Sequence, residues 1–314
     1  YVLRTGEVFQ RKDKYMKKYD LMILGPAVRD ENIDYTGAVD RSVGGAVTFC
    51  TPAARAANPS VFAGVKVAPE DADIMEAFRM PKEDLALIPA KKTMRMRNEY
   101  FTADRERREA TCLAQSDALL PEEVPNVEFR LAHLAGVVYG DFPNELIDFL
   151  KARGKVSADA QGLLRHVENG KLIFRDWKEK REYLPKLDFL KTDAAEAEIL
   201  TGMTDRVQAA KQLHDWGAKE ILISHNSEML AYDGKRIYTC PVRARSLAGR
   251  TGRGDTTFGS YLAMRMAGSS IRESLLYATA CVSLKMETPG AFVGTRADVE
   301  KYIDTFYLQE KGAL

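Results

Sequence analysis

The sequence has little of what marks several protein classes. Its formal net charge is +1, from 46 basic and 45 acidic residues, so it lacks the basic excess with which proteins bind nucleic acid or membrane surfaces. No apolar run approaches the roughly 20 residues of a membrane span. The cysteines and histidines, four of each, are scattered without CxxC or Cys/His ligand spacing. We therefore expect no zinc site and no His-based triad, and we predict reduced, buried thiols in a cytoplasmic protein.

The start of the chain is polar and charged and lacks the apolar core of a signal peptide. Met16 is followed by two lysines and then by the first apolar run. We expect residues 1–20 to be an extension outside the fold, with the natural start at Met16. Residues 21–314 contain no linker-like or low-complexity segment, and we expect them to form a single domain.

The apolar segments alternate between the strand and the helix pattern. Short apolar runs at 21–24, 60–67, 131–138, 156–160, 187–191 and 220–224 predict buried strands. Helical patterns near 144–152, 194–200 and 207–216 separate the later ones. This order predicts a mostly parallel sheet covered by helices on both faces, an α/β fold. An Asp-Gly turn near residue 233 predicts a hairpin over 228–241, and three helices close the chain.

Two polar segments interrupt this pattern in the first third of the chain. Residues 26–43 are polar and contain glycine, and within 93–113 residues 94–99 alternate between Met or Asn and charged side chains. Period-two alternation with one polar face is typical of strands that are open to solvent on one side. We predict a small β-sheet, contributed by about 26–43 and 93–113, beside the main domain.

A glycine-rich turn lies directly before an amphipathic helix near the C-terminal end. Gly252-Arg253-Gly254-Asp255 precedes the helical pattern of residues 256–267. Glycines at a helix start let several backbone amides converge on one point, where the helix dipole favours an anion. The aspartate there can accept a proton from a substrate hydroxyl beside a phosphate. No GxxxxGK[ST] sequence is present, which excludes a Walker-type loop.

Residues 251–259, TGRGDTTFG, resemble the C-terminal signature of the ribokinase/PfkB carbohydrate kinase family, D-T-x-G-A-G-D-x-F-x-G. The resemblance implies a ribokinase-like three-layer sandwich with a β-sheet lid. It implies that Asp255 is the catalytic base and that the amides from Gly252 to Asp255, with Arg253 and Gly254 between them, form the anion hole. Thr251 is implied at the nucleotide. Arg253 stands where the family has a small residue.

Earlier landmarks agree with this family in order and spacing. Asp30, five residues after Gly25, and the pair Gly44-Gly45 resemble its sugar-binding positions. Asp193 and Glu196 resemble its N-x-x-E element, which implies that Glu196 helps to hold Mg²⁺ and that Asp193 lies at the nucleotide. Further nucleotide positions are implied by the T-x-G-like segment after the strand 220–224 and by the loop before the last helices; they are Ser224, Asn226 and Gly290.

The molecule that accepts the phosphoryl group is indicated by residues that vary within the family. Asp159, Gln161 and Arg165 resemble the D-x-Q-x-x-x-R segment of the myo-inositol kinase branch, and they follow a predicted strand at its carboxyl end. Asn32, Arg97 and Asn98 from the lid segments are further candidates. A ring of hydroxyls needs several fixed donors and acceptors, and these residues predict a cyclitol or sugar substrate.

Three readings of the function stay open on the sequence. The first is ATP-dependent, Mg²⁺-assisted phosphorylation of a cyclitol or sugar, with a requirement for a monovalent cation undecided. The second is a nucleoside kinase of the same family, in which Tyr100 or Phe101 would stack on the base. The third is a regulator that binds a sugar or nucleotide without turnover. The family also implies that a homodimer can form through the lid.

Overall fold

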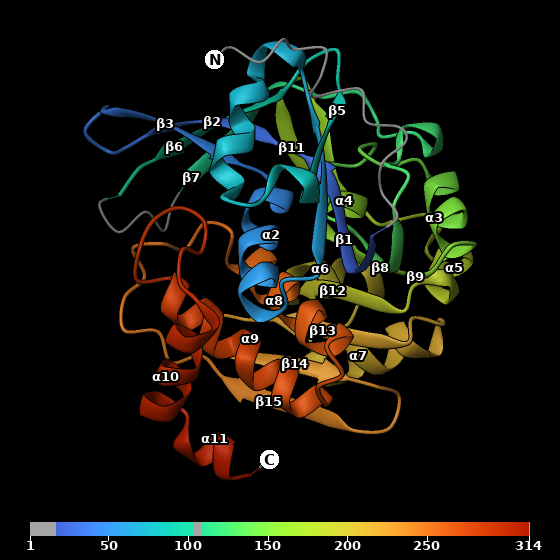
Figure 1. The fold of residues 1–314 in the computed structure, drawn as a ribbon, viewed down its shortest axis with the longest axis vertical. Helices are drawn as coiled ribbons and strands as arrows, with labels where there is room; N and C mark the ends of the chain where they lie inside the picture. Colours follow the sequence, from blue (N-terminus) through green and yellow to red (C-terminus); the bar gives the residue numbers. More distant parts are fainter. Residues whose placement is uncertain (1–16, 103–107, 314) are drawn as a thin grey trace.

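The structure is a computed structural model that describes residues 17–102 and 108–313. Nine strands in these residues form one sheet in the order β15-β14-β13-β12-β9-β8-β1-β4-β5, in which the seven strands from β13 to β5 run parallel (Figure 1). The strands are β1 (Lys18–Pro26), β4 (Val61–Val67), β5 (Leu85–Pro89), β8 (Glu128–Leu134), β9 (Lys155–Asp159), β12 (Phe189–Asp193), β13 (Glu220–Ser224), β14 (Glu228–Tyr232) and β15 (Ile237–Pro241). The predicted α/β fold is confirmed.

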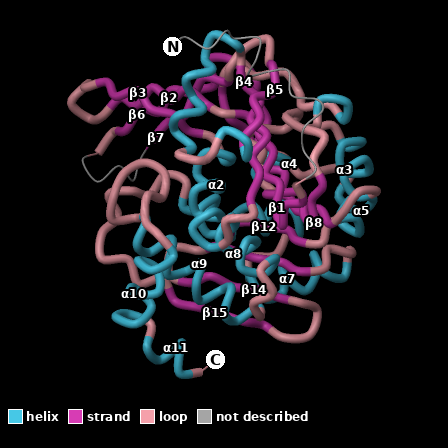
Figure 2. The backbone as a smooth tube through the Cα atoms, in the orientation of Figure 1, coloured by secondary structure: helices cyan, strands magenta, loops and turns pink. Residues whose placement is uncertain are grey.

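Helices cover both faces of this sheet and make three layers (Figures 1 and 2). One hydrophobic core lies between the sheet and α2, α8, α9 and α10, and a second lies on the other face beneath α3, α6 and α7. The helices are α2 (Ala46–Ala57), α3 (Asn144–Lys151), α4 (Gln161–Leu164), α5 (Lys180–Tyr183), α6 (Ala194–Thr201), α7 (Arg206–Asp215), α8 (Arg253–Met266), α9 (Ile271–Lys285), α10 (Arg296–Phe306) and α11 (Leu308–Gly312). Short 3₁₀ helices are η1 (Pro69–Phe78), η2 (Lys82–Asp84), η3 (Pro121–Glu123) and η4 (Leu184–Lys186).

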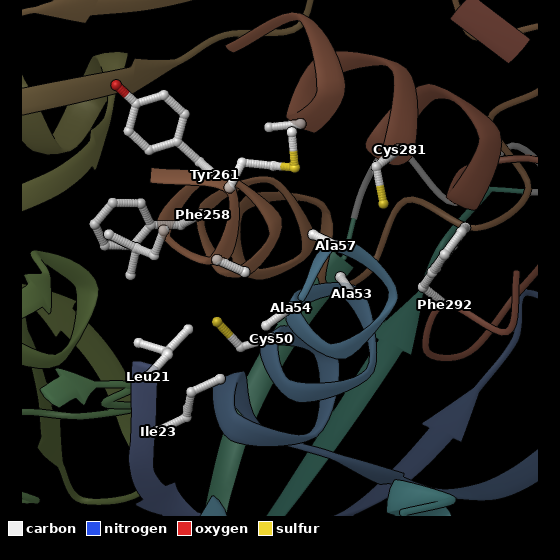
Figure 3. Close-up of a cluster of buried hydrophobic side chains, with 14 of the residues drawn as sticks. Leu21, Ile23, Cys50, Ala53, Ala54, Ala57, Phe258, Tyr261, Cys281 and Phe292 are labelled. Carbon is white, nitrogen blue, oxygen red and sulfur yellow. The ribbon is translucent and has the colours of Figure 1, made fainter. Parts of the chain in front are cut away.

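Small residues bring α2 and α8 close together. Cys50, Ala53, Ala54 and Ala57 of α2 face the helix that carries Phe258 and Tyr261 (Figure 3). A Cβ at residue 259 would lie 2.5 Å from the carbonyl oxygen of Cys50, so this helix pair requires glycine there. The close packing fixes where α8 begins, and with it the position of the turn that precedes this helix.

A second sheet of six strands, here called the lid sheet, has the order β10-β11-β7-β6-β2-β3. Its strands are β2 (Val28–Ile33), β3 (Val39–Gly44), β6 (Met94–Tyr100), β7 (Arg108–Ala114), β10 (Arg165–Glu168) and β11 (Lys171–Phe174). The first four lie in the two predicted segments, whose 103–107 portion is outside the described residues. The predicted lid omitted β10 and β11, although Asn169-Gly170 signals their hairpin. Both residues have positive φ, 51° and 80°, as a two-residue type I′ turn requires.

The start of the fold also differs from its predicted boundary. β1 begins at Lys18, so residues 18–20 belong to the sheet and not to an extension. Tyr19 is buried in the hydrophobic core on the sheet face that α3 and α7 cover. Burial of this side chain is consistent with a strand that begins before residue 21. Residues 1–16 of the predicted extension lie outside the described residues. No helix in the described part of the chain is long and apolar enough to cross a membrane.

Candidate active site

The turn before α8 has the geometry of an anion site. Gly252 caps the helix with φ 75°, a conformation that favours glycine, and a Cβ there would overlap the ring of Phe49. A Cβ on Gly254 would lie 2.8 Å from the ammonium nitrogen of Lys191. Glycine is therefore required at residue 252, whereas a side chain at residue 254 would have to displace the end of the Lys191 side chain. The first-turn amides of this 14-residue helix have no intrahelical partners, and that of Arg253 donates to the carbonyl of Arg250 at 3.3 Å.

Asp255 is buried in the first turn of α8, beside this anion site. The pKa of its carboxyl group is raised to about 6, mainly by burial and in addition by the negative charge of Asp159. Lys191, Arg165 and Lys285 oppose the rise. The carboxylate is thus poised to exchange a proton near neutral pH, which a general base requires.

Lys191 lies at the centre of the charges around Asp255. It stands in the middle of β12, is buried, and has its Nζ 3.0 Å from a carboxylate oxygen of Asp159 and 3.8 Å from one of Glu196. Burial lowers the pKa of Lys191, but the surrounding carboxylates raise it more, so the lysine stays charged. The prediction missed this cation. A lysine between apolar residues of a buried strand was the signal that could have revealed it.

A cavity of about 730 Å³ opens over the turn and the carboxyl ends of β12 and β13. Its lining is rich in cations; they are Arg108, Lys191, Arg250 and Arg253. Arg253 donates from its Nη1 to the side-chain oxygen of Asn226 at 2.6 Å, so its guanidinium spans from α8 to the loop after β13. This cavity, called the donor cavity below, also contains the predicted Ser224 and Thr251.

Asp193 and Glu196 form a capping box at the start of α6. The carboxylate of Asp193 accepts from the amide of Glu196 at 2.8 Å, and that of Glu196 accepts from the amide of Asp193 at 2.7 Å. Both residues line the donor cavity. Burial raises the pKa of Glu196 to about 7, and Lys191 opposes the rise. The described residues contain no cluster of three or more potential metal ligands, so a metal here would take most of its ligands from phosphates and water.

A second, smaller cavity of about 110 Å³, called the acceptor cavity below, lies between the turn and the lid sheet. Its polar lining comes from both sheets and includes Asp30, Asn98, Gln161 and Arg165. Burial raises the pKa of Asp30 to about 6, while Arg108, the Asn98 amide and Arg165 lower it. These groups offer both donors and acceptors to a polyol.

The predicted glycine pair shapes this acceptor cavity. A Cβ on Gly44 would overlap the carboxylate of Asp30, and Gly45 caps α2 with φ 94°. Gly45 and Phe49 line the cavity, so the backbone approaches any bound molecule closely at this point. Gly44 thus lies against Asp30 and Gly45 lines the cavity, and their role in substrate binding stays a prediction.

Gln161 and Arg165 reach the acceptor cavity, but Asp159 does not. Asp159 lies beneath the site, where it accepts from the amide of Gln161 at 3.0 Å and pairs with Lys191. Gln161 and Arg165 bond the carbonyls of Gly136 and Val137, which fixes their positions. The prediction of Asp159 as a substrate ligand is therefore corrected, because its oxygens are taken up by neighbouring protein groups.

The alternation of side chains along β6 places Arg97, another predicted substrate ligand, outside the acceptor cavity. Successive side chains of β6 point to opposite faces of the lid sheet. Asn98 faces Asp30 and donates to it at 3.4 Å, whereas Arg97 points the other way and pairs with Glu31 at 2.7 Å. Arg97 is thus not a ligand of the acceptor cavity. Asn32 accepts a hydrogen bond from the Asn98 amide at 3.1 Å but does not itself line the cavity.

Gly290 is also placed away from its predicted site. It lines a separate cavity formed by α2, η1 and residues 289–296, while its neighbour Pro289 lines both that cavity and the donor cavity. Asn226 acts through Arg253, whose guanidinium it holds.

The donor and acceptor cavities share five lining residues, and Asp255 is one of them. The others are Arg108, Gln161, Thr251 and Gly252. A cation-rich space and a polyol-sized space therefore meet at one buried carboxylate and at the amides of one helix start. This arrangement suits transfer of an anionic group from one space to a molecule in the other.

Residues 84–296 match the family model described as "pfkB family carbohydrate kinase". The chain belongs to this family. Among curated proteins it is similar to a cytidine kinase of Thermococcus kodakarensis, at 31% identity over 110 residues, which are 34% of this chain and 37% of that protein. A ribokinase of Arabidopsis thaliana is 30% identical over 118 residues, 35% of this chain and 31% of its own length. The matches thus span about a third of these curated relatives.

Solved structures of pfkB-type kinases resemble the chain over nearly all of its length. One is a pyrophosphate-dependent kinase of the ribokinase family bound to a pyrophosphate analogue and myo-inositol. It has a TM-score of 0.80 and 31% identity, covering 90% of this chain and 99% of its own. Another is a pyrophosphate-dependent myo-inositol-1 kinase converted into a myo-inositol-3 kinase, at 30% identity, 92% and 100% coverage and a TM-score of 0.80. The predicted likeness to the myo-inositol kinase branch is confirmed.

Proposed function

We propose that this protein phosphorylates a hydroxyl group of a cyclitol or related small polyol. The observation that carries the proposal is the position of Asp255, which lines both the donor and the acceptor cavity. Its raised pKa adds support, because a carboxylate with a pKa near the working pH accepts a proton more readily than an ordinary aspartate. The similarity to structures with bound myo-inositol favours a cyclitol over other polyols.

In this proposal the acceptor hydroxyl faces Asp255 and the terminal phosphoryl group lies over the turn. The hydroxyl oxygen forms a bond to phosphorus as the bond to the leaving phosphate breaks, and the proton passes to Asp255. The amides of Gly252, Gly254 and Asp255 and the ammonium of Lys191 stabilise the charge on the transferred group. The amide of Arg253, also expected in this set from the sequence, donates instead to the carbonyl of Arg250 at 3.3 Å. Mg²⁺ bound at Glu196 would neutralise phosphate charge, and the carboxylate ligands fit that ion.

Two phosphoryl donors compete for the donor cavity, and we propose pyrophosphate ahead of the ATP expected from the sequence. Four cationic side chains line the cavity together with three carboxylates, those of Asp193, Glu196 and Asp255. The three arginines among the cations can make charge-assisted contacts with a small, dense anion. The bond from Arg253 also occupies the side-chain oxygen of Asn226, a residue expected from the sequence to contact a nucleotide. Leu247 and Pro289 offer an apolar surface to an adenine ring, so ATP stays the second candidate.

A donor comparison tests this choice. The purified protein is assayed with myo-inositol and Mg²⁺, and with pyrophosphate or ATP in parallel. We expect a higher kcat/KM with pyrophosphate. The variant Arg253→Ala should raise the KM for pyrophosphate about tenfold or more, since one charge-assisted contact is lost. Turnover with ATP alone would restore the nucleotide as donor and contradict the preference stated here.

The acceptor cavity distinguishes a cyclitol kinase from a nucleoside kinase. Its volume of about 110 Å³ and its polar lining suit a single small ring. Tyr100 lines the donor cavity and not the acceptor cavity, so it offers no stacking surface beside Asp30. A panel of inositols, ribose, fructose and nucleosides tests the assignment. Turnover of cytidine with silent cyclitols would establish the nucleoside reading, and binding of several sugars without turnover would establish a regulator.

A further inference from the structure

Lys285 is a second buried lysine near the turn, and the mechanism above leaves it unused. It is the last residue of α9 and is 1% exposed. Its Nζ donates to the carbonyl oxygen of Gly249 at 2.6 Å and also to that of Thr251. Among the described residues no carboxylate pairs with it directly. Asp255 attracts it from a greater distance.

The surroundings of Lys285 suit a cation without a carboxylate partner. The ring of Phe49 lies 5.2 Å from the ammonium, and the same ring packs beneath Gly252. The ammonium belongs to the C-terminal end of a 15-residue helix, where the dipole favours positive charge. Burial lowers the pKa of Lys285 to about 8, so the side chain is still mostly protonated at pH 7.

The two carbonyls that Lys285 binds belong to the peptide groups that lead into the anion site. In a trans peptide the C=O and the N–H point in opposite directions. The carbonyl of Thr251 and the amide of Gly252 share one such group. When the carbonyl points to the buried ammonium, the amide of Gly252 points away from it, and Gly252 lines both the donor and the acceptor cavity. The carbonyl of Gly249 orients the amide of Arg250 in the same way.

Other contacts hold the same segment against the end of α9. The amide of Gly249 donates to the carbonyl of Met286 at 2.8 Å, and a Cβ on Gly249 would overlap the carbonyl of Thr288. These contacts fix where the segment lies, but they leave the carbonyls of Gly249 and Thr251 to be satisfied. Lys285 satisfies both and so sets the rotation of the two peptide planes.

We propose that Lys285 is a built-in cation that orients the phosphate-binding turn and makes a bound monovalent cation unnecessary at this place. The proposal rests on the proposed phosphoryl transfer. Backbone carbonyls that converge on one point are the ligands that K⁺ takes in proteins, and here an ammonium occupies that point. Lys285 is thus a positioning residue, which acts on the donor through the amides of the turn. The monovalent cation left open by the sequence is not expected at these carbonyls.

The first test compares cations on the wild-type enzyme and on two variants. Wild-type kcat should change less than twofold when KCl is replaced by tetramethylammonium chloride at equal ionic strength. Lys285→Met should lower kcat roughly 100-fold, the loss typical of a missing oxyanion donor, with little change in the KM for the acceptor. In Lys285→Ala, added K⁺ or NH₄⁺ should raise kcat at least tenfold, because a small cation can enter the space that the lysine side chain leaves.

The control is Lys66→Met, which removes another lysine that is 1% exposed and lies outside both cavities. Its kcat should stay within twofold of wild type. A wild-type enzyme that needs K⁺ overturns the proposal, as does a Lys285→Met variant that keeps its kcat. If that variant does not fold, the wild-type cation series and the cation rescue of Lys285→Ala still decide.

A second measurement is independent of turnover. Hydrogen exchange at the amides of residues 249–255 should be faster in Lys285→Met than in wild type, and addition of pyrophosphate should protect them less. If no acceptor is phosphorylated, the proposed function fails while this measurement still reports on the lysine. Unchanged exchange in Lys285→Met would refute the positioning role even if activity fell.

Discussion

Replacing Asp255 by asparagine should make the protein more stable at neutral pH while it abolishes phosphoryl transfer. The carboxyl group has its pKa raised from 3.8 to about 6 by burial and by Asp159. Each pKa unit corresponds to about 1.4 kcal/mol, so ionised Asp255 costs the folded state about 3 kcal/mol. Asparagine carries no charge, and Lys191 keeps Asp159 as its partner at 3.0 Å.

The pH dependence of this effect has a definite sign. Between about pH 4 and pH 6 the folded protein binds a proton at Asp255 that the unfolded chain has already lost, so stability falls as the pH rises through this window. Above pH 6 the full cost is present, and below pH 4 both states are protonated and the cost disappears. The stabilisation by asparagine should therefore be large at pH 7 and near zero at pH 4.

Chemical unfolding followed by tryptophan fluorescence, at pH 7 and pH 4, measures the difference. We expect about 1–3 kcal/mol at pH 7, since the new amide must still find hydrogen-bond partners, and a rise of ~2–6 °C in Tm. The kcat of Asp255→Asn should fall by a factor of about 10²–10⁴, as for loss of a general base. Asp215→Asn, at an exposed residue of α7, is the control and should change neither property.

Three results would refute the reasoning. An equal gain in stability at pH 4 and pH 7 would mean that the charge of Asp255 is not the cause. Turnover close to the wild-type rate would mean that another group accepts the proton. A loss of turnover with no gain in stability would show that the carboxylate is not strained by its burial, in conflict with its environment in the structure.

Further predictions concern the charges around the site and its association. Activity should fall below about pH 7 with a slope greater than one, because Asp255 and Asp30 titrate near 6 and Glu196 near 7; a pH profile of kcat/KM checks this. Lys191→Met removes a charge that lowers the pKa of Asp255, so any residual activity should need a higher pH, which the same profile measures. Gly254→Ala should lower kcat while acceptor binding measured by calorimetry persists, since the new Cβ would meet the Lys191 ammonium at 2.8 Å. The homodimer expected through the lid sheet stays a prediction; sedimentation should show a dimer that a charge introduced by Val39→Glu on the exposed strand β3 disrupts.

Much of the site could be predicted because it follows the ends of strands. Parallel strands finish at one edge of a sheet, so polar residues that follow apolar runs meet there. Asp193 and Ser224 close adjacent strands, in register with each other, and both line the donor cavity. The turn at Gly252 could be recognised for a local reason too, because glycine and aspartate at a helix start have a direct physical meaning.

The missed and corrected residues depend on contacts between distant segments. Arg97 and Asn98 are adjacent and both polar, and only the pairing of β6 with β2 decides which of them faces Asp30. Asp159 reads as a ligand until Lys191 is seen to occupy its carboxylate. In each case the local sequence indicates that a polar group lies at the edge of the sheet that forms the site, but it does not indicate which group is its partner.

The sequence by itself determined the layered α/β fold, the glycine-rich turn before α8 and the polar strand ends, since hydrophobic period and backbone preference act over a few residues. Only the tertiary structure decided how charge is distributed over the site. Lys191 and Lys285 come from segments 94 residues apart, and packing buries both of them near the turn before α8, which no local pattern encodes. The charge of a buried group depends on every neighbour within several ångströms, and those neighbours are brought together only when the sheet and helices pack.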